Sequence, residues 1–296
     1  MLLSFDTAVL RDRYGDETAL RMIAAAGFDA YDYSMFRADG EKFMLGDDYR
    51  ERAIRLRAVA DELGLVCRQA HAPFNFEYDD VIDISAEKYL HQVRSLEIAS
   101  ILGAENIVVH TVKRNLPDDF DLEGFSYTFY RSFIPYCERF NMHISVENLV
   151  GKKPITNEKF PVFSNPQQHL AFVESLDSEW FNICIDLGHS ALLGYAPQDV
   201  IASMNKTVFR TMHVHDNDFL ADSHVLPYDG KMDWEAILRA LARVDFQGDF
   251  SFELEGYLKP LSDEEMPRGL EKAARLGREM IQKINAYKEE YKSSNC

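Results

Sequence analysis

Apolar runs of strand length alternate along the chain with longer segments of helical periodicity. This alternation is typical of repeated βα units, in which a helix returns the chain from the end of one strand to the start of the next. Glycines at positions 27, 64 and 103 predict helix ends just before the following strands. The strands are predicted near residues 2–6, 29–33, 64–71, 106–111, 142–148, 181–186, 208–215 and 249–255. The helices are predicted near 16–26, 48–63, 85–102, 124–140, 166–176, 197–205, 233–243 and 265–290.

Eight such pairs predict an α/β protein, a (β/α)8 TIM barrel. No linker rich in proline or glycine and no low-complexity tract divides the chain, so residues 1–296 are expected to form a single domain, with a tail frayed from about 285 to 296. Two longer segments, 149–165 and 216–232, follow the fifth and seventh strands. Loops in this position shape the substrate pocket of a barrel, and we expect these two to act as lids.

Side chains alternate between the two faces of a strand, and this parity separates apolar from polar positions in four of the predicted strands. In the fifth strand, for example, Ile144 and Val146 share one face and Ser145 shares the other with Glu147. In a parallel barrel the apolar faces pack against helices and the opposite faces point inward. The last inward positions of the four strands, which should meet at one rim, are Glu147, Asp186, His213 and Glu253.

Three carboxylates and one imidazole form an oxygen-rich donor set for a divalent metal that stays open to substrate oxygens. Mn²⁺ is the metal that we expect first, with Co²⁺, Mg²⁺ and Zn²⁺ as alternatives. A single carboxylate at a strand end is more often solvated or ion-paired than metal-bound. Four rim positions of matching parity instead favour metal binding over a solvated or ion-paired role.

Further imidazole and carboxylate groups follow other predicted strands. We expect them to bind substrate hydroxyls or to orient the metal carboxylates, although they could instead hold a second and a third metal ion. For His215 a hydrogen bond within the barrel is the preferred interpretation, and His91, His143 and His169 are expected to be structural. Lys113 and Arg114 could contact a substrate anion but are more often solvated. The expected substrate-binding residues are His71, His110, His189, Asp222 and His224.

The composition suits such a scaffold, since 46% of the 296 residues are hydrophobic. The chain carries 32 basic and 49 acidic residues, a formal charge of −17 that makes nucleic acid and anionic membranes unfavourable partners. The four cysteines, Cys67, Cys137, Cys184 and Cys296, show no paired spacing, which favours a reducing compartment. The sequence shows no targeting signal and no apolar run of membrane-spanning length, so we expect a cytoplasmic protein.

The ordered motifs resemble those of the xylose isomerase-like TIM barrel superfamily, which includes sugar isomerases and epimerases, inosose dehydratases and apurinic endonucleases. The similarity covers nearly the whole chain. The motifs are Gln-Ala-His71, Val-Val-His110, Val-Glu147-Asn, Asp186-Leu-Gly-His189, His213-Val-His-Asp, Asp222-Ser-His224 and Phe-Glu253-Leu.

The resemblance to ketose 3-epimerases implies that Glu147, Asp186, His213 and Glu253 bind one metal. It further implies that the two glutamates exchange protons with the substrate and that His189 binds a substrate oxygen. A metal that polarises a carbonyl acidifies the neighbouring C–H and stabilises an enediolate, which explains this division of roles. The chain departs from the epimerase pattern at Phe219, where those enzymes place a substrate-binding arginine.

The implied function is a metal-dependent sugar or sugar phosphate isomerase or epimerase of carbohydrate metabolism. An apurinic-endonuclease-like multinuclear phosphodiesterase is the alternative. The resemblance implies that the four proposed metal ligands and the five proposed substrate-binding residues match the nine ligands of the three metal ions in those endonucleases. The negative charge of the chain opposes DNA binding. A related dehydratase or C-glycoside lyase, and a sugar-binding barrel without turnover, also remain open. The expected partner is a small carbohydrate, and a homo-oligomer is neither favoured nor excluded.

Overall fold

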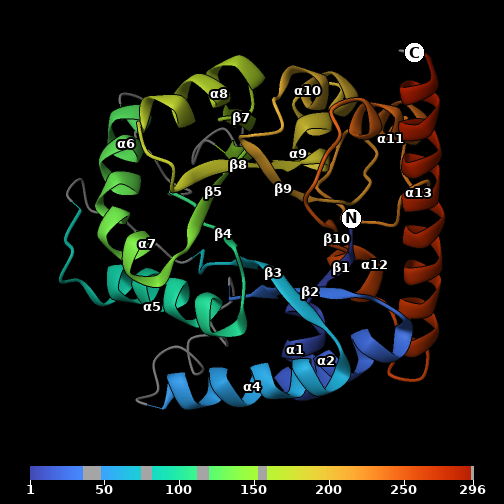
Figure 1. Ribbon diagram of the computed structural model, residues 1–296, viewed down its shortest axis with the longest axis horizontal. Coiled ribbons are helices and arrows are strands. Elements are labelled where there is room, and N and C mark those ends of the chain that lie inside the picture. Colours follow the sequence, from blue (N-terminus) through green and yellow to red (C-terminus); the bar gives the residue numbers. More distant parts are fainter. Residues whose placement is uncertain (36–47, 75–81, 112–119, 153–158, 295–296) are drawn as a thin grey trace.

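Eight parallel strands form the centre of the molecule, which is known from a computed structural model that describes residues 1–35, 48–74, 82–111, 120–152 and 159–294. The strand order is β10-β1-β2-β3-β4-β5-β8-β9, and a bridge between Val214 and Phe252 joins the two ends of this sheet. The predicted TIM barrel is therefore confirmed, with helices around the ring of strands (Figure 1). The barrel strands are β1 (Leu3–Asp6), β2 (Ala30–Ser34), β3 (Val66–His71), β4 (Asn106–Val108), β5 (His143–Glu147), β8 (Phe181–Asp186), β9 (Phe209–His213) and β10 (Phe250–Phe252).

The helices predicted from the sequence are all present, and the described residues contain three further short helices that were not predicted. The predicted helices are α2 (Asp16–Ala26), α4 (Tyr49–Leu63), α5 (Glu87–Leu102), α6 (Leu122–Ser132) with α7 (Ile134–Phe140), α8 (Pro166–Ser175), α10 (Pro197–Ser203), α11 (Trp234–Arg243) and α13 (Met266–Ser294). The additional helices are α1 (Ala8–Tyr14), α9 (Leu187–Leu192) and α12 (Glu255–Leu258). Gly27, Gly64 and Gly103 end α2, α4 and α5 with positive φ angles of 94°, 72° and 94°, as predicted.

Several element boundaries differ from the prediction. The segment 124–140 is two helices, because Pro135, the second residue of α7, lacks the N–H that a continuous helix would need. Strand β4 ends at Val108, and the next carbonyl, that of Val109, accepts a hydrogen bond from the Tyr130 hydroxyl. Helix α13 extends to Ser294, beyond the predicted helix end near 290, and Tyr287 packs against the core and donates to Glu235 at 2.6 Å.

The barrel strands place apolar side chains outward against the helices and polar side chains inward. In β1, Leu3 and Phe5 face outward, and Phe5 contacts the ring of Phe28 with centroids 4.9 Å apart. A Cβ at Gly277 of α13 would lie 2.4 Å from Leu3, so this glycine lets the helix pack directly on the strand. Burial of each large apolar side chain contributes roughly 1.5–3 kcal/mol. This packing fixes which residues face the barrel interior.

The described residues of the two predicted rim segments include paired strands and a hydrogen-bonded loop. In segment 149–165, β6 (Leu149–Lys152) pairs antiparallel with β7 (Lys159–Val162). In segment 216–232 the buried carboxylate of Asp216 accepts five hydrogen bonds. The donors are the backbone N–H groups of Asn217, Tyr228, Lys231 and Met232 and the indole N–H of Trp234.

Within the described part of the chain, no helix has the length and apolar content needed to cross a membrane. Cys67, Cys137 and Cys184 are buried free thiols, and Cys296 lies outside the described residues.

Candidate metal and substrate site

The four side chains predicted to converge do so at the carboxyl ends of the strands. Glu147, Asp186 and His213 end β5, β8 and β9, and Glu253 directly follows β10. The Nδ1 atom of His213 lies 2.9 Å from Glu147 Oε1, 3.6 Å from Glu253 Oε2 and 3.9 Å from Asp186 Oδ2. All four side chains are buried. The imidazole nitrogen is therefore surrounded by three carboxylates that arrive from different strands.

Hydrogen bonds to Asn148 join two of these strand ends. The Asn148 side chain accepts from the backbone N–H of Asp186 at 2.7 Å and donates to the Asp186 carbonyl at 2.9 Å. The Asp186 carboxylate in turn caps helix α9 by accepting from the backbone N–H of His189 at 2.6 Å. These bonds hold Asp186 beside Glu147, the residue that precedes Asn148.

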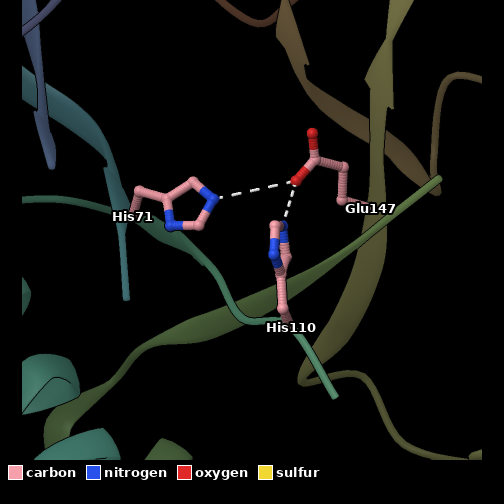
Figure 2. A group of neighbouring side chains, drawn as sticks. All are labelled: His71, His110 and Glu147. Carbon is pink, nitrogen blue, oxygen red and sulfur yellow. Dashed lines mark hydrogen bonds and ion pairs between the residues drawn. The ribbon is translucent and has the colours of Figure 1, made fainter. Parts of the chain in front are cut away.

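A second group of side chains lies around Oε2, the second carboxylate oxygen of Glu147. Figure 2 shows His71 and His110 both directed at this oxygen. His71 Nε2 lies 3.7 Å from Glu147 Oε2, and His110 Nε2 makes a hydrogen bond to the same oxygen. The half-exposed ring of Phe74 contacts both imidazoles, each with a centroid distance of 4.9 Å. Phe74 thus adds an apolar face beside polar groups, an arrangement suited to a sugar ring.

A third group contains His189, Asp222 and His224. The Nδ1–H groups of the two histidines donate to the carbonyls of Asn148 and Glu253, at 2.9 and 3.1 Å. Their Nε2 atoms both lie 3.3 Å from a carboxylate oxygen of Asp222. Backbone acceptors of this kind fix the tautomer of an imidazole and leave Nε2 free to bind a metal or a hydroxyl.

Burial and close charges shift the titration of these groups. Burial lowers the pKa of His110 to about 4, although the nearby Glu147 opposes this shift. Burial would raise the pKa of Glu147, but His213 and His110 outweigh it and hold that pKa well below its usual value. The pKa of His224 is raised to about 10, because Glu253 and Asp222 outweigh the effect of burial. The carboxylate of Glu147 is therefore favoured in its ionised, ligand-competent form.

These donor sets fit divalent metals. Groups of three ligand atoms that lie within 4.8 Å of one another include Glu147–Asp186–His189, His71–His110–Glu147 and His189–Asp222–His224. Carboxylate and imidazole donors suit Mn²⁺, Co²⁺ and Zn²⁺, and the carboxylates also suit Mg²⁺. The residues could thus hold one ion among the four converging side chains and further ions in the outer groups.

Parity in the first two strands would have found two interior carboxylates that the sequence analysis missed. In β2, Tyr31 and Tyr33 alternate with Asp32, which is buried beside His213. In β1, Phe5 alternates with Asp6, whose pKa is raised well above its usual value by burial and by Glu253. The same rule that selected Glu147 therefore extends to the inward-facing aspartates of β1 and β2.

Other expected residues fall into place more simply. His215 hydrogen-bonds both Asp186 oxygens through Nε2, as the expected structural role requires. Cys184, which carried no predicted role, joins Glu147 and His213 as a possible ligand group in the barrel interior. Phe219 is 44% exposed on the loop after β9, so this loop offers an apolar side chain to solvent. The expected structural residues His91, His143 and His169 lie in α5, at the start of β5 and in α8.

Lys113 and Arg114, considered as anion contacts, lie outside the described residues.

A curated relative and several solved structures are similar to this chain. The relative, "Uncharacterized protein y4fM" from Sinorhizobium fredii, is 29% identical over 170 residues, which cover 53% of this chain and 50% of the relative. The chain thus matches about half the length of that relative. Similarity to solved structures at 14–18% identity shows the fold alone.

Among the solved structures, a D-tagatose 3-epimerase-like protein superposes with a TM-score of 0.74 at 18% identity, over 97% of this chain and 99% of its own. A D-psicose 3-epimerase from Clostridium cellulolyticum H10 reaches 0.74 at 14% identity, over 95% and 99% of the two chains. The IOLI protein with a bound zinc atom reaches 0.67 at 17% identity, over 97% and 99%.

A family model described as "Xylose isomerase-like TIM barrel" matches residues 20–284, a range that contains every residue of the converging site. The chain therefore belongs to the xylose isomerase-like TIM barrel family.

Proposed function

We propose that the protein is a divalent-metal-dependent isomerase or epimerase of a sugar or sugar phosphate. The observation that carries the proposal is the placement of Glu147 and Glu253 on the two sides of His213 and Asp186 in the strand order. Two carboxylates in this arrangement can remove a proton from one face of a carbon and return it from the other. The sugar epimerases among the structural neighbours support the same class of reaction.

Glu147, Asp186, His213 and Glu253 would hold the metal, with Mn²⁺ as the first candidate and Co²⁺, Mg²⁺ and Zn²⁺ as alternatives. The bound ion would draw electron density from a substrate carbonyl and so acidify the C–H bond next to it.

Glu147 is proposed to accept that proton, because His110 and His71 approach its carboxylate and orient it, while His213 and His110 keep its pKa low. Glu253 is proposed to exchange a proton with the opposite face of the substrate. These two residues are the proposed catalytic groups.

The remaining groups are proposed to bind the substrate. His71, His110 and His189 present imidazole nitrogens that can hydrogen-bond hydroxyls, while Asp222 and His224 close the outer side. A small carbohydrate, phosphorylated or free, fits this lining. We further propose that the protein acts in carbohydrate metabolism in the cytoplasm.

Solvent-deuterium exchange tests the proposal. Protein loaded with Mn²⁺ is incubated in D₂O with a panel of ketopentoses, ketohexoses and 3-keto-glucosides, and deuterium next to the carbonyl is measured by NMR. Glu147→Gln and Glu253→Gln should reduce exchange at least 100-fold, since each removes one proton acceptor. Glu105→Gln, at an exposed carboxylate just before β4, is the matched control and should leave exchange unchanged. Undiminished exchange in both glutamine variants would reject these catalytic roles.

A multinuclear phosphodiesterase is the second candidate, favoured by the two outer ligand groups around His71 and Asp222. Three ions could activate water for attack on a phosphodiester. The formal charge of −17 opposes this function, because binding DNA requires several phosphate contacts. Incision of an abasic duplex at low salt, together with three tightly bound ions per chain, would establish it in place of the epimerase.

Two further outcomes of the same panel are distinguishable by product analysis. Loss of water or of an aglycone would identify a dehydratase or a C-glycoside lyase that uses the same proton acceptors. Saturable sugar binding without exchange would identify a sugar-binding barrel.

A further inference from the structure

His213 presents its two ring nitrogens to different neighbours. Nδ1 faces Glu147, Glu253 and Asp186, whereas Nε2 faces Asp32 on strand β2, with Asp32 Oδ2 at 3.6 Å. The side chains of His213 and Asp32 are both 2% exposed. Protein groups therefore surround the His213 imidazole at both Nδ1 and Nε2.

The Asp32 carboxylate is itself held in place. Gln69 of β3 donates from Nε2 to Asp32 Oδ2 at 2.5 Å, and the hydroxyl of Ser251 on β10 lies 3.5 Å from the same oxygen. The other oxygen, Oδ1, has no hydrogen-bond partner among the residues that the structure describes. A buried carboxylate with one oxygen left without a hydrogen bond is costly for folding, so stability alone does not explain an aspartate at this position.

An imidazole that ligates a metal must offer a lone pair from one nitrogen and keep its proton on the other. A carboxylate facing the distal nitrogen stabilises that proton and fixes the ring orientation, an arrangement worth 10–100-fold in metal affinity in other proteins. We propose that Asp32 is a positioning residue, which holds His213 with its proton on Nε2 so that Nδ1 is free to bind the metal. The inference rests on the proposed metal site and is independent of the reaction that follows.

Asp32 lies on the opposite side of His213 from the proposed ligands, and it belongs to neither the proposed ligand set nor the proposed catalytic pair. Its contribution is therefore to the affinity and geometry of metal binding. This predicts that its removal weakens metal binding without removing any ligand, and that the His213 tautomer changes with it.

Calorimetric titration of the metal-free protein with Zn²⁺ and Mn²⁺ tests the inference. Asp32→Ala should bind either ion 10–100-fold more weakly than the wild type, and Asp32→Asn should lose less, because its amide oxygen can still accept from Nε2. Asp249→Asn is the matched control, since Asp249 is also a buried carboxylate but precedes β10 at the opposite end of the barrel. It should retain wild-type affinity.

Nitrogen-15 NMR of the Zn²⁺-loaded wild type supplies an independent readout, with the His213 proton expected on Nε2. Cooperative urea unfolding of each metal-free variant shows that the variant is folded. If Asp32→Ala does not fold, the metal affinity of Asp32→Asn decides the outcome.

Affinity within twofold of wild type in a folded Asp32 variant, or a loaded His213 protonated on Nδ1, would overturn the inference. If the wild type itself binds neither ion, the proposed metal site fails instead, so the two failures are distinguishable.

Discussion

The imidazole of His215 stacks on that of His224, with ring centroids 3.8 Å apart and planes inclined by 11°. His215 also reaches both oxygens of Asp186 through Nε2, at 3.2 and 3.1 Å. The His215 ring therefore contacts both Asp186, a proposed ligand of the central metal, and His224, a member of the third group. Displacement of His215 should affect both parts of the site.

Gly188→Ala is expected to displace that ring. A Cβ at Gly188 would lie 2.0 Å from Cε1 of His215, which is closer than packed atoms allow. We expect a loss of about 1–3 kcal/mol in the free energy of unfolding, together with weaker binding of Mn²⁺. Urea denaturation and calorimetry measure the two effects. In a His215→Ala background the same substitution should cost almost nothing, and an equal cost in both backgrounds would contradict the proposed clash.

Asp216→Ala is expected to disorganise the loop that carries Asp222 and His224. The substitution removes the Asp216 acceptor from five donors, of which the Lys231 N–H keeps a second acceptor in the Asn217 carbonyl, and the expected cost is about 3 kcal/mol in stability. Trp234→Phe removes one of these donors and should cost about 1 kcal/mol from the lost bond. Chemical denaturation compares the two variants. Similar small losses in both would show that the carboxylate does not organise the loop.

Asp249 predicts a specific dependence of stability on pH. Burial raises the pKa of Asp249 to about 6, although Arg68 opposes the shift. Between the ordinary pKa and this raised one, the folded protein binds a proton that the unfolded chain has lost, so stability falls as pH rises from about 4 to about 6. The contribution is about 3 kcal/mol.

Asp249→Asn removes this titration, so its stability relative to the wild type should improve between pH 4.5 and pH 7. Denaturation curves at the two pH values measure the difference. A difference between the variant and the wild type that is independent of pH would contradict the raised pKa.

Metal removal should destabilise the protein, because Glu147, Asp186 and Glu253 place three carboxylates around one imidazole. An ion that binds the folded state alone contributes about 4 kcal/mol at a concentration 1,000 times its dissociation constant. The melting temperature should therefore rise on titration with Mn²⁺ and fall with a chelator. Glu253→Gln should reduce the rise, whereas Glu105→Gln should not; equal rises in both would place the ion elsewhere.

The barrel and the convergence of the central side chains could be predicted from the sequence, because strand parity and the βα rhythm are local properties. Asp32 was accessible to the same parity rule, since Tyr31 and Tyr33 occupy the other face of its strand. Its approach to His213 is a contact between β2 and β9, which strand parity alone does not place.

Features that depend on tertiary contacts were not predictable in this way. The hairpin of β6 and β7 forms by pairing residues of one rim segment, and α13 continues to Ser294 because Tyr287 packs against the core and hydrogen-bonds Glu235. The tautomers of His189 and His224 depend on carbonyls from other elements. None of these contacts leaves a periodic pattern in the sequence.

Deuterium uptake by a keto sugar in D₂O, measured with and without Mn²⁺, tests the central claim most directly. The proposed roles of Glu147 and Glu253 predict metal-dependent exchange next to the carbonyl of at least one sugar in the panel, lost in both glutamine variants and kept in Glu105→Gln. Exchange that persists without metal or in both variants, or incision of abasic DNA by protein that exchanges no sugar, would contradict the account.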